Sequence, residues 1–307
     1  MRRSLDEIYE EVYSKYGIKL EENKKIDEKI SKVAMAVWAI IAAISIVILI
    51  FIGFNFSNII KIGGLNFVCW MITRIVVACI LSIGERKNGS SKKDIIKTIV
   101  CGVFPSAEYS RGKGIPSSEY RGYFWGDKCD RFFSEDLIAT NDKINLNFSE
   151  VHTQYMFKNK EGDYEYRTSF LGIAGYFDLP KSIDTKIYIT ADKKLEKKTE
   201  DKVCLDMPEF EEIFDVYTGN KIKAVALLTA DVMTELIEMK KKLNLMFDIA
   251  IENDRVYFRI NTGEILEVEM FIDTQLSIEI LSKHYNLLCY VDDVAKLLYK
   301  HVGNLEI

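Results

Sequence analysis

The sequence lacks the short motifs that the common nucleotide hydrolases and hydrolytic enzymes require. None of the patterns G-x-x-x-x-G-K-[ST], H-E-x-x-H and G-x-S-x-G occurs in the 307 residues. Each pattern brings particular groups into one site: a phosphate cradle, a pair of zinc ligands, or an exposed nucleophile. The sequence therefore gives no support to nucleotide hydrolysis, to a zinc protease or to a hydrolase with a nucleophile elbow.

The sequence also lacks C-x-x-C pairs. Because of this absence we expect no disulfide framework, which fits a reducing compartment. The cysteines at positions 69 and 79 lie in an apolar segment, where cysteine is a small packing residue. The six cysteines are Cys69, Cys79, Cys101, Cys129, Cys204 and Cys289.

Basic residues are outnumbered by acidic residues over most of the chain. Residues 1–97 contain 15 Lys and Arg against 10 Asp and Glu, a net charge of +5. The chain totals are 41 and 46, so 26 and 36 remain for residues 98–307, a net charge of −10. A nucleic-acid partner is not expected, because neutralising phosphates requires a positive face. The basic first part is typical of a segment beside anionic lipid headgroups.

One stretch has no charge at all. Residues 33–54, VAMAVWAIIAAISIVILIFIGF, are 22 residues long, and only Ser45 and Trp38 carry polar side-chain groups. As a helix this stretch would be roughly 33 Å long, enough to cross a hydrocarbon core of about 30 Å. A buried core helix needs only about 10 to 14 apolar residues. The stretch predicts a first membrane span.

A second span is predicted over residues 65–83, LNFVCWMITRIVVACILSI, with Arg74 at its centre. An arginine at that depth costs roughly 2.5–3.5 kcal/mol, and the apolar residues of the segment return about 3–6 kcal/mol. Two interpretations of Arg74 stay open. It makes a polar contact with a partner or lines a pathway, or else it snorkels toward the interface from a span shifted in depth.

Lysine and arginine flank the two spans on the same side. Residues 13–32 contain six lysines and residues 84–97 contain five lysines and arginines, whereas the loop at 55–64, with its Gly-Gly turn, contains only Lys61. The positive-inside rule then places both termini in the cytoplasm, with the spans in the plasma or inner membrane. Before the spans, residues 4–16 predict an amphipathic helix ended by Gly17.

The second half of the chain reads as strands followed by helices. Residues 143–157 alternate apolar and polar side chains and predict a strand paired in a hairpin with residues 165–179 across a KNKEGD turn. A second hairpin is predicted over residues 245–260, turning at Asn253-Asp254. Further strands are expected at 186–190, 211–217 and 263–269. Helices are expected at 93–103, at 230–243 with Thr229 as N-cap, and at 274–301.

This pattern predicts an α+β fold: an N-terminal two-helix transmembrane hairpin, then a soluble antiparallel-sheet domain with two late helices. The predicted parts are a cytoplasmic amphipathic segment at 1–32, the transmembrane hairpin at 33–83 (spans 33–54 and 65–83), a linker with a juxtamembrane helix at 84–105, and a cytoplasmic α+β domain at 106–307.

Several motifs carry a resemblance to a known family. They are SEDL (134–137), SEVHTQY (149–155), TSFLGIAGYFDLPK (168–181), and PEFEEIFDVY followed by ALLT (within 208–229). In this order they resemble the bacterial family called domain of unknown function 3137. Departures are Ile173-Ala174, where the family has Leu-Phe, and Ala230, where it has proline. The resemblance implies two N-terminal spans and a cytoplasmic-type soluble domain, and it implies no activity.

A metal site is conceivable on the predicted strand 143–157. Glu150 and His152 are two residues apart, so their side chains point to one face. A third ligand could come from Asp127, Asp130 or Asp136. The other interpretation is a polar pair on the solvent face of the strand, and we assign no metal, cofactor or catalytic residue.

An aromatic cluster offers a different kind of site. Tyr120, Tyr123, Phe124 and Trp125 could form an exposed binding patch, although packing against the edge of the sheet is the other interpretation. The sequence as a whole predicts a membrane-anchored cytoplasmic binding or regulatory module. Its expected partners are the lipid bilayer and a protein, with self-association included. Alternatives are a membrane-tethered metal-dependent enzyme and a subunit of a larger transport assembly.

Overall fold

The computed structural model describes residues 2–52, 56–121, 128–191, 201–263 and 278–304. Within them the chain divides into two compact units. The first, which we call the sheet unit, contains residues 1–8, 96–267 and 278–307. The second, the helical unit, contains residues 9–95.

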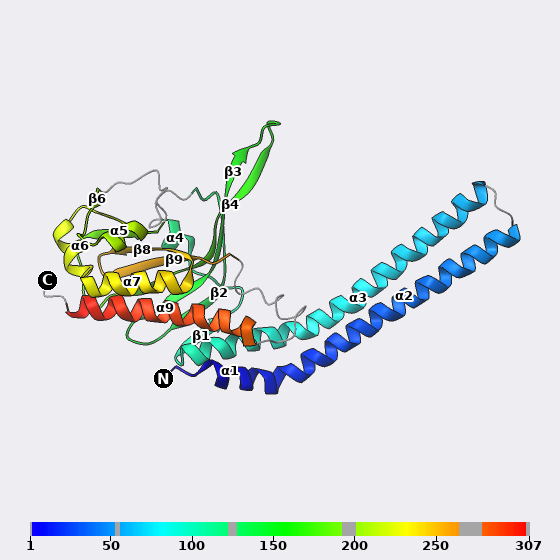
Figure 1. Cartoon of the computed structure of the whole chain (residues 1–307), viewed down its shortest axis with the longest axis horizontal. Helices are drawn as coiled ribbons and strands as arrows, with labels where there is room; N and C mark the ends of the chain where they lie inside the picture. The colour runs from blue at the N-terminus through cyan, green and yellow to red at the C-terminus, as the bar shows by residue number, and fades with distance from the viewer. Residues whose placement is uncertain (1, 53–55, 122–127, 192–200, 264–277, 305–307) are drawn as a thin grey trace. The chain divides into compact units, whose positions relative to one another are not determined.

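The helical unit is built from α2 (Ile18–Ile52) and the greater part of α3 (Phe56–Val103), which run antiparallel (Figure 1). Ser45 Oγ donates to Ile41 O and lies 2.9 Å from Asn66 Oδ1, which joins the two helices by a hydrogen bond. Among the described residues, one helical stretch is long and apolar enough to cross a membrane, Glu28–Ile48, and only 6% of its most apolar window is buried. A shorter apolar stretch is Asn66–Val76.

Two local predictions for this unit are wrong. The loop expected at 55–64 is helical from Phe56 onward, and the linker expected at 85–93 is part of the same helix. Gly63 and Gly64 lie within this helix and do not form a turn. An interior glycine lowers the stability of a helix by only about 1 kcal/mol relative to alanine, so two of them do not end it. The amphipathic helix at the N-terminus is confirmed as α1 (Leu5–Val12), but Gly17 closes a π-helical turn (Tyr13–Gly17) and the chain continues as α2.

The sheet unit contains, in its described residues, one antiparallel sheet with the order β1-β2-β3-β4-β9-β8-β5-β7-β6. Each strand pairs with its neighbours in antiparallel register. The strands are β1 (Ala107–Ser110), β2 (Arg131–Thr140), β3 (Asn147–Lys158), β4 (Tyr164–Asp178), β5 (Lys186–Thr190), β6 (Lys202–Val203), β7 (Asp215–Thr218), β8 (Met246–Glu252) and β9 (Arg255–Asn261).

The α+β class predicted from the sequence is confirmed. Both expected hairpins form, as β3–β4 and as β8–β9 with Asn253 in the left-handed conformation at its turn. The strand expected at 211–217 is half wrong, because Pro208 begins a helix, α5 (Pro208–Ile213), before β7. Strand β2 and the short helices α4 (Ser117–Arg121) and α6 (Lys221–Leu227) were not predicted. Most of the strand expected at 263–269 lies outside the described residues.

Helices α7 (Ala230–Leu243) and α9 (Ile278–Asn304) pack against each other along one face of the sheet (Figure 1). Thr229 is the N-cap of α7 as predicted, and Asn244 ends that helix in the left-handed conformation. The opposite face has a core of aromatic and small residues, in which Tyr120 of α4 is fully buried. Its other members include Val151, Phe170, Ala174, Tyr188, Tyr217, Ala250 and Tyr257.

The first residues of the chain are fastened to the last helix of the same unit. Arg2 Nη2 donates to Asp292 Oδ2 and to Asp293 Oδ1, each at 2.5 Å. Tyr285 Oη donates to Arg3 O at 2.8 Å, and Arg3 N donates to Gly102 O at 2.9 Å. Ser4 and Glu7 form a capping box that starts α1.

Candidate functional site

The hairpin of β3 and β4 extends beyond the rest of the sheet as a two-stranded ribbon (Figure 1). On one side, β2 pairs with β3 only as far as Arg131 opposite Gln154. On the other side, β9 pairs with β4 only over Ile173–Asp178. From Tyr155 to Arg167 the two strands therefore pair with each other alone in the described structure. A ribbon without a covering layer exposes both of its faces.

A β-bulge marks the place where the ribbon leaves the sheet. The register of β3 and β4 shifts between Thr153 and Gln154, where Ser169 is the extra residue of β4. A bulge bends a strand pair and increases its twist. Thr153 Oγ1 and Ser169 Oγ lie 2.8 Å apart and hold this bend with a hydrogen bond.

One face of the ribbon is aromatic and basic, and we call it the ribbon face. Its most exposed apolar members are Tyr164 (67% exposed), Phe133 (52%), Met156 (48%) and Tyr166 (40%). Residues that lie opposite each other on paired strands share a face of the sheet, and so do residues two positions apart on one strand. Met156 lies opposite Tyr166, and Phe133 lies opposite His152, two positions before Gln154, so these side chains are on one face. The remaining members are Arg131, His152, Gln154, Lys158 and Thr168.

Cations stack on the aromatic rings of the ribbon. The guanidinium of Arg131 lies 3.4 Å from the ring centre of Tyr166, and Lys158 Nζ lies 5.9 Å from that of Tyr164. The charged members of the ribbon face are thus both cations. Stacked arginine and tyrosine side chains offer a rigid apolar surface together with positive charge, the combination that is enriched in protein-binding hot spots.

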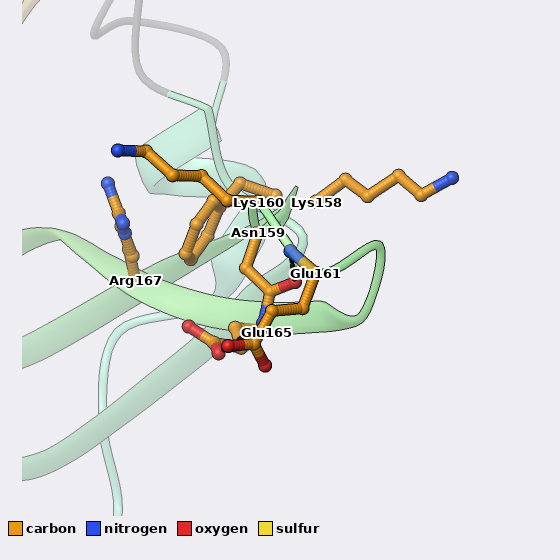
Figure 2. Close-up of a pocket in the computed structure, with 7 residues that line it drawn as sticks. Lys158, Asn159, Lys160, Glu161, Glu165 and Arg167 are labelled. Carbon is orange, nitrogen blue, oxygen red and sulfur yellow. Dashed lines mark hydrogen bonds between the residues drawn. The ribbon is translucent and has the colours of Figure 1, made fainter.

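The turn of the ribbon is organised by Asn159. Its Oδ1 accepts hydrogen bonds from the backbone N–H groups of Glu161 and Asp163, at 3.0 and 2.8 Å. Its Nδ2 donates to Glu165 Oε1 at 2.7 Å (Figure 2). These bonds fix the turn and leave a shallow cavity of about 520 Å³ on the other face of the ribbon, where Arg167 stacks on Phe157 at 3.6 Å.

The predicted pair Glu150 and His152 does share one face of β3. Glu150 is 9% exposed, opposite Glu135 of β2. His152 Nε2 lies 2.9 Å from Thr168 Oγ1, and the His152 ring lies 5.9 Å from that of Phe133. His152 is thus part of the ribbon face, where the structure gives it a hydroxyl partner and an aromatic neighbour.

The aspartates considered as a third metal ligand have other partners or lie outside the described residues. Asp130 Oδ2 accepts from the backbone N–H of Met156 at 2.6 Å, at the edge of the ribbon. Asp136, in the bulge of β2, accepts from Tyr109 Oη at 2.6 Å. Asp127 is outside the described residues. Within the described ranges no group of three or more His, Cys, Asp and Glu side chains is arranged to hold a metal ion.

The predicted aromatic patch needs one correction. Tyr120 is fully buried rather than exposed, with its ring 5.5 Å from that of Phe132 and 5.8 Å from that of Phe170. The short helix α4 places its ring against the sheet, where it packs with these aromatic rings. Tyr123, Phe124 and Trp125 lie outside the described residues. The exposed aromatic side chains of the ribbon were missed, although the alternation of Tyr164 and Tyr166 beside a turn was a signal for them.

A row of polar side chains crosses the sheet on the face that Tyr120 covers. Asp248 of β8 lies opposite both Arg259 of β9 and Thr190 of β5. Arg259 Nε donates to Asp248 Oδ2 at 2.5 Å, and Thr190 Oγ1 donates to Asp248 Oδ1 at 2.6 Å. The Asp248 and Arg259 side chains are each only 7% exposed, and the carboxylate is satisfied on both oxygens. We interpret this row as part of the core, because buried charges are stable only when paired.

Two further groups have shifted pKa values outside the ribbon. Burial, together with the hydrogen bond to Asp136, raises the pKa of Tyr109 above its ordinary range. A hydrogen bond to Asp215 at 2.7 Å raises the pKa of Lys202. Both groups therefore keep their ordinary charge state at neutral pH, and neither is prepared for proton transfer there.

Arg74 lies in the helical unit. Its guanidinium is 5.8 Å from the ring centre of Trp70, one turn earlier on the same helix. Both side chains line a cavity of about 400 Å³ between α2 and α3. Among the described residues, no carboxylate forms an ion pair with Arg74.

Fold and surfaces together define a mixed α+β protein with an apolar helix near the N-terminus and a projecting ribbon. Residues 168–298, from β4 to α9, match the family described as "Protein of unknown function (DUF3137)". The resemblance predicted from the motifs is therefore confirmed over these residues.

Among solved structures, the crystal structure of the mycobacterial trehalose monomycolate transport factor A, TtfA, is similar with a TM-score of 0.34 and 8% sequence identity. That similarity covers 64% of this chain and 93% of the other. No curated protein matches the chain significantly.

Proposed function

We propose that this chain is a membrane-anchored binding module that captures a protein partner on the ribbon face. The ribbon face carries this proposal, because it exposes four large apolar side chains beside two stacked cations. Apolar surface of this kind, on an element with no other packing role, is typical of interaction sites. The partner segment that fits combines apolar side chains with carboxylates, which would pair with Arg131 and Lys158.

The membrane part of the proposal rests on the helical unit. The stretch Glu28–Ile48 exposes Ile, Val, Met and Trp side chains that would be unfavourable in water, and α3 lies antiparallel to it. We propose that α2 and the apolar part of α3 cross the bilayer as a hairpin. Both termini are then cytoplasmic, because the lysine-rich segments 13–32 and 84–97 flank the hairpin and the positive-inside rule places such segments in the cytoplasm. A single cysteine at position 90 should react with a membrane-impermeant thiol reagent only after cells are opened. Labelling at position 90 in intact cells would refute this orientation.

Photo-crosslinking in native membranes tests the binding role. A photoreactive residue replaces Tyr164 on the ribbon face in the full chain, and the matched control replaces Ile222 of α6, which is 82% exposed on a different surface. We expect a discrete protein adduct from position 164, absent from position 222 and weakened by Arg131→Glu. The same adducts from both positions, or no effect of Arg131→Glu, would contradict the proposal. An adduct of twice the chain mass would identify the partner as a second copy.

The alternatives receive no specific support. A metal-dependent enzyme would use Glu150 and His152, but His152 already contacts Thr168. A role as a subunit of a transport assembly would be visible in the same experiment, as adducts to membrane proteins from positions within the helical unit.

A further inference from the structure

The structure shows at which level of α2 the cavity beside Arg74 lies, which could not be predicted from the sequence alone. The Ser45–Asn66 hydrogen bond fixes how α2 and α3 align. Arg74 is eight residues beyond Asn66, and because the helices are antiparallel it lies at the level of about residue 37 of α2. The lining of the cavity agrees, since it joins Trp38 and Met35 of α2 with Arg74.

This alignment moves Arg74 away from the middle of the membrane. The apolar run of α2 begins at Val33, about four residues from the level of Arg74, or roughly 6 Å along the helix. An arginine side chain reaches that far, so its guanidinium can lie at the headgroup boundary. Measured against the second predicted span alone, the same residue would be central.

The residues around Arg74 are those of a membrane interface. Trp38 and Trp70 are 42% and 41% exposed, at the depth where tryptophans form interfacial belts. Ser31 and Thr73 add hydroxyl groups to the cavity, and Arg74 stacks over Trp70. Exposed Lys29 and Lys32 lie within a turn of Ser31 on α2, as does exposed Glu28, and the three give a net charge of +1.

We infer that this cavity binds the phosphate headgroup of one anionic phospholipid from the cytoplasmic leaflet. The inference rests on the proposed transmembrane hairpin. The Arg74 guanidinium can hold phosphate oxygens with two parallel N–H donors, and in the described structure no carboxylate occupies it. The apolar flanks of α2 and α3 would lie along the acyl chains, while the two tryptophans cover the glycerol region.

Native mass spectrometry of the detergent-solubilised full chain tests the inference, with phosphatidylglycerol, phosphatidylcholine and inorganic phosphate as separate probes. We expect one phosphatidylglycerol to be retained per chain, in preference to phosphatidylcholine, and inorganic phosphate not to compete. Arg74→Gln should weaken retention about tenfold or more, since a charge-assisted pair is lost. Arg74→Lys should retain part of it, and Lys97→Gln, in the last part of α3, should match the unchanged chain.

Equal retention by Arg74→Gln and the unchanged chain would overturn the inference, as would equal binding of the two lipids. Displacement by inorganic phosphate would assign the site to a free anion and overturn the lipid assignment. A carbonate wash of membranes separates this failure from that of the proposed function. If the chain resists the wash but Arg74→Gln retains lipid, only the lipid site is wrong. If the wash releases the chain, the membrane hairpin is wrong, and the lipid site with it.

Discussion

Strands β3 and β4 run through both the body of the sheet and the ribbon, yet their apolar side chains are buried in the body and exposed on the ribbon. In the body, Phe148 of β3 is fully buried, with its ring 5.7 Å from that of Phe104. A few residues further along β3, Met156 is 48% exposed. The two strands are paired on both sides of the bulge, so neighbouring layers, not the pairing itself, decide which side chains are buried. Apolar residues that no layer covers are available to a partner.

The body of the sheet and the ribbon also differ in the interactions that their arginine side chains make. Arg259 in the body is buried in an ion pair with Asp248, whereas Arg131 on the ribbon lies over a tyrosine ring. The first arrangement stabilises the fold only while both charges are present. The second keeps a cation near the surface, where it can meet an incoming carboxylate.

Asp248→Asn should give the largest loss of stability in the sheet unit. It removes the carboxylate that balances the buried Arg259 charge, and breaking a buried ion pair costs about 3–5 kcal/mol. Urea denaturation of the full chain in mild detergent, followed by circular dichroism, would measure it. The double variant Asp248→Leu with Arg259→Met should recover most of the loss, and Asp254→Asn at the exposed turn is the control. A loss below about 1 kcal/mol would show that the row is not a core element.

Gly175→Ala tests the close packing of the body. A methyl group at this position would lie 2.3 Å from Phe148 Cβ and 2.4 Å from Asn147 O, so the strands must move apart. We expect a loss of about 1–3 kcal/mol in the same denaturation measurement. Gly219→Ala is the matched control, because nothing lies within 4 Å of a methyl group there. Similar stabilities for the two variants would contradict the close contact between β3 and β4.

The ribbon should give the smallest effect on stability. Tyr164→Ser should change the free energy of unfolding by less than about 0.5 kcal/mol, since the side chain is exposed. Tyr166→Ser also loses the stack with Arg131, and its cost should stay within about 1 kcal/mol. Tyr166→Ser, combined with the photoreactive residue at position 164, should still weaken the crosslink expected from the ribbon face. A destabilisation as large as that of Asp248→Asn would mean that the ribbon is packed against another part of the protein.

The sequence predicted the hairpins correctly where alternating apolar and polar residues flank a glycine or asparagine typical of a turn. The alternation of 143–157 and 165–179 around Gly162, and of 245–260 around Asn253, predicted the two hairpins that form. It failed for β2, where a bulge between Glu135 and Ile138 interrupts the alternation. It failed for α5 because residues 211–213 were read with the strand that follows them, although Pro208, at the first helical position, was a start signal.

The candidate surface was less predictable than the fold. Tyr120 and Tyr164 both lie in aromatic stretches of sequence, yet one is fully buried and the other is 67% exposed. Tyr120 is buried because α4 packs on the sheet, and Tyr164 is exposed because β2 and β9 stop pairing with β3 and β4 before the ribbon. Both outcomes depend on the packing of the whole sheet. The position of Arg74 along its own helix was predictable from the sequence, whereas its level relative to α2 follows from the contacts between the two helices.

The contacts of Arg2 and Arg3 with α9 can form only after α9 has been synthesised. Arg2 leaves the ribosome 290 residues before Asp292, its partner in the ion pair. At about 5–20 residues per second this is a wait of roughly 15 to 60 s. Both helices of the helical unit are synthesised during that wait, before the ion pair between Arg2 and α9 can form. Protease sensitivity of the N-terminal segment on stalled nascent chains should therefore persist until α9 emerges.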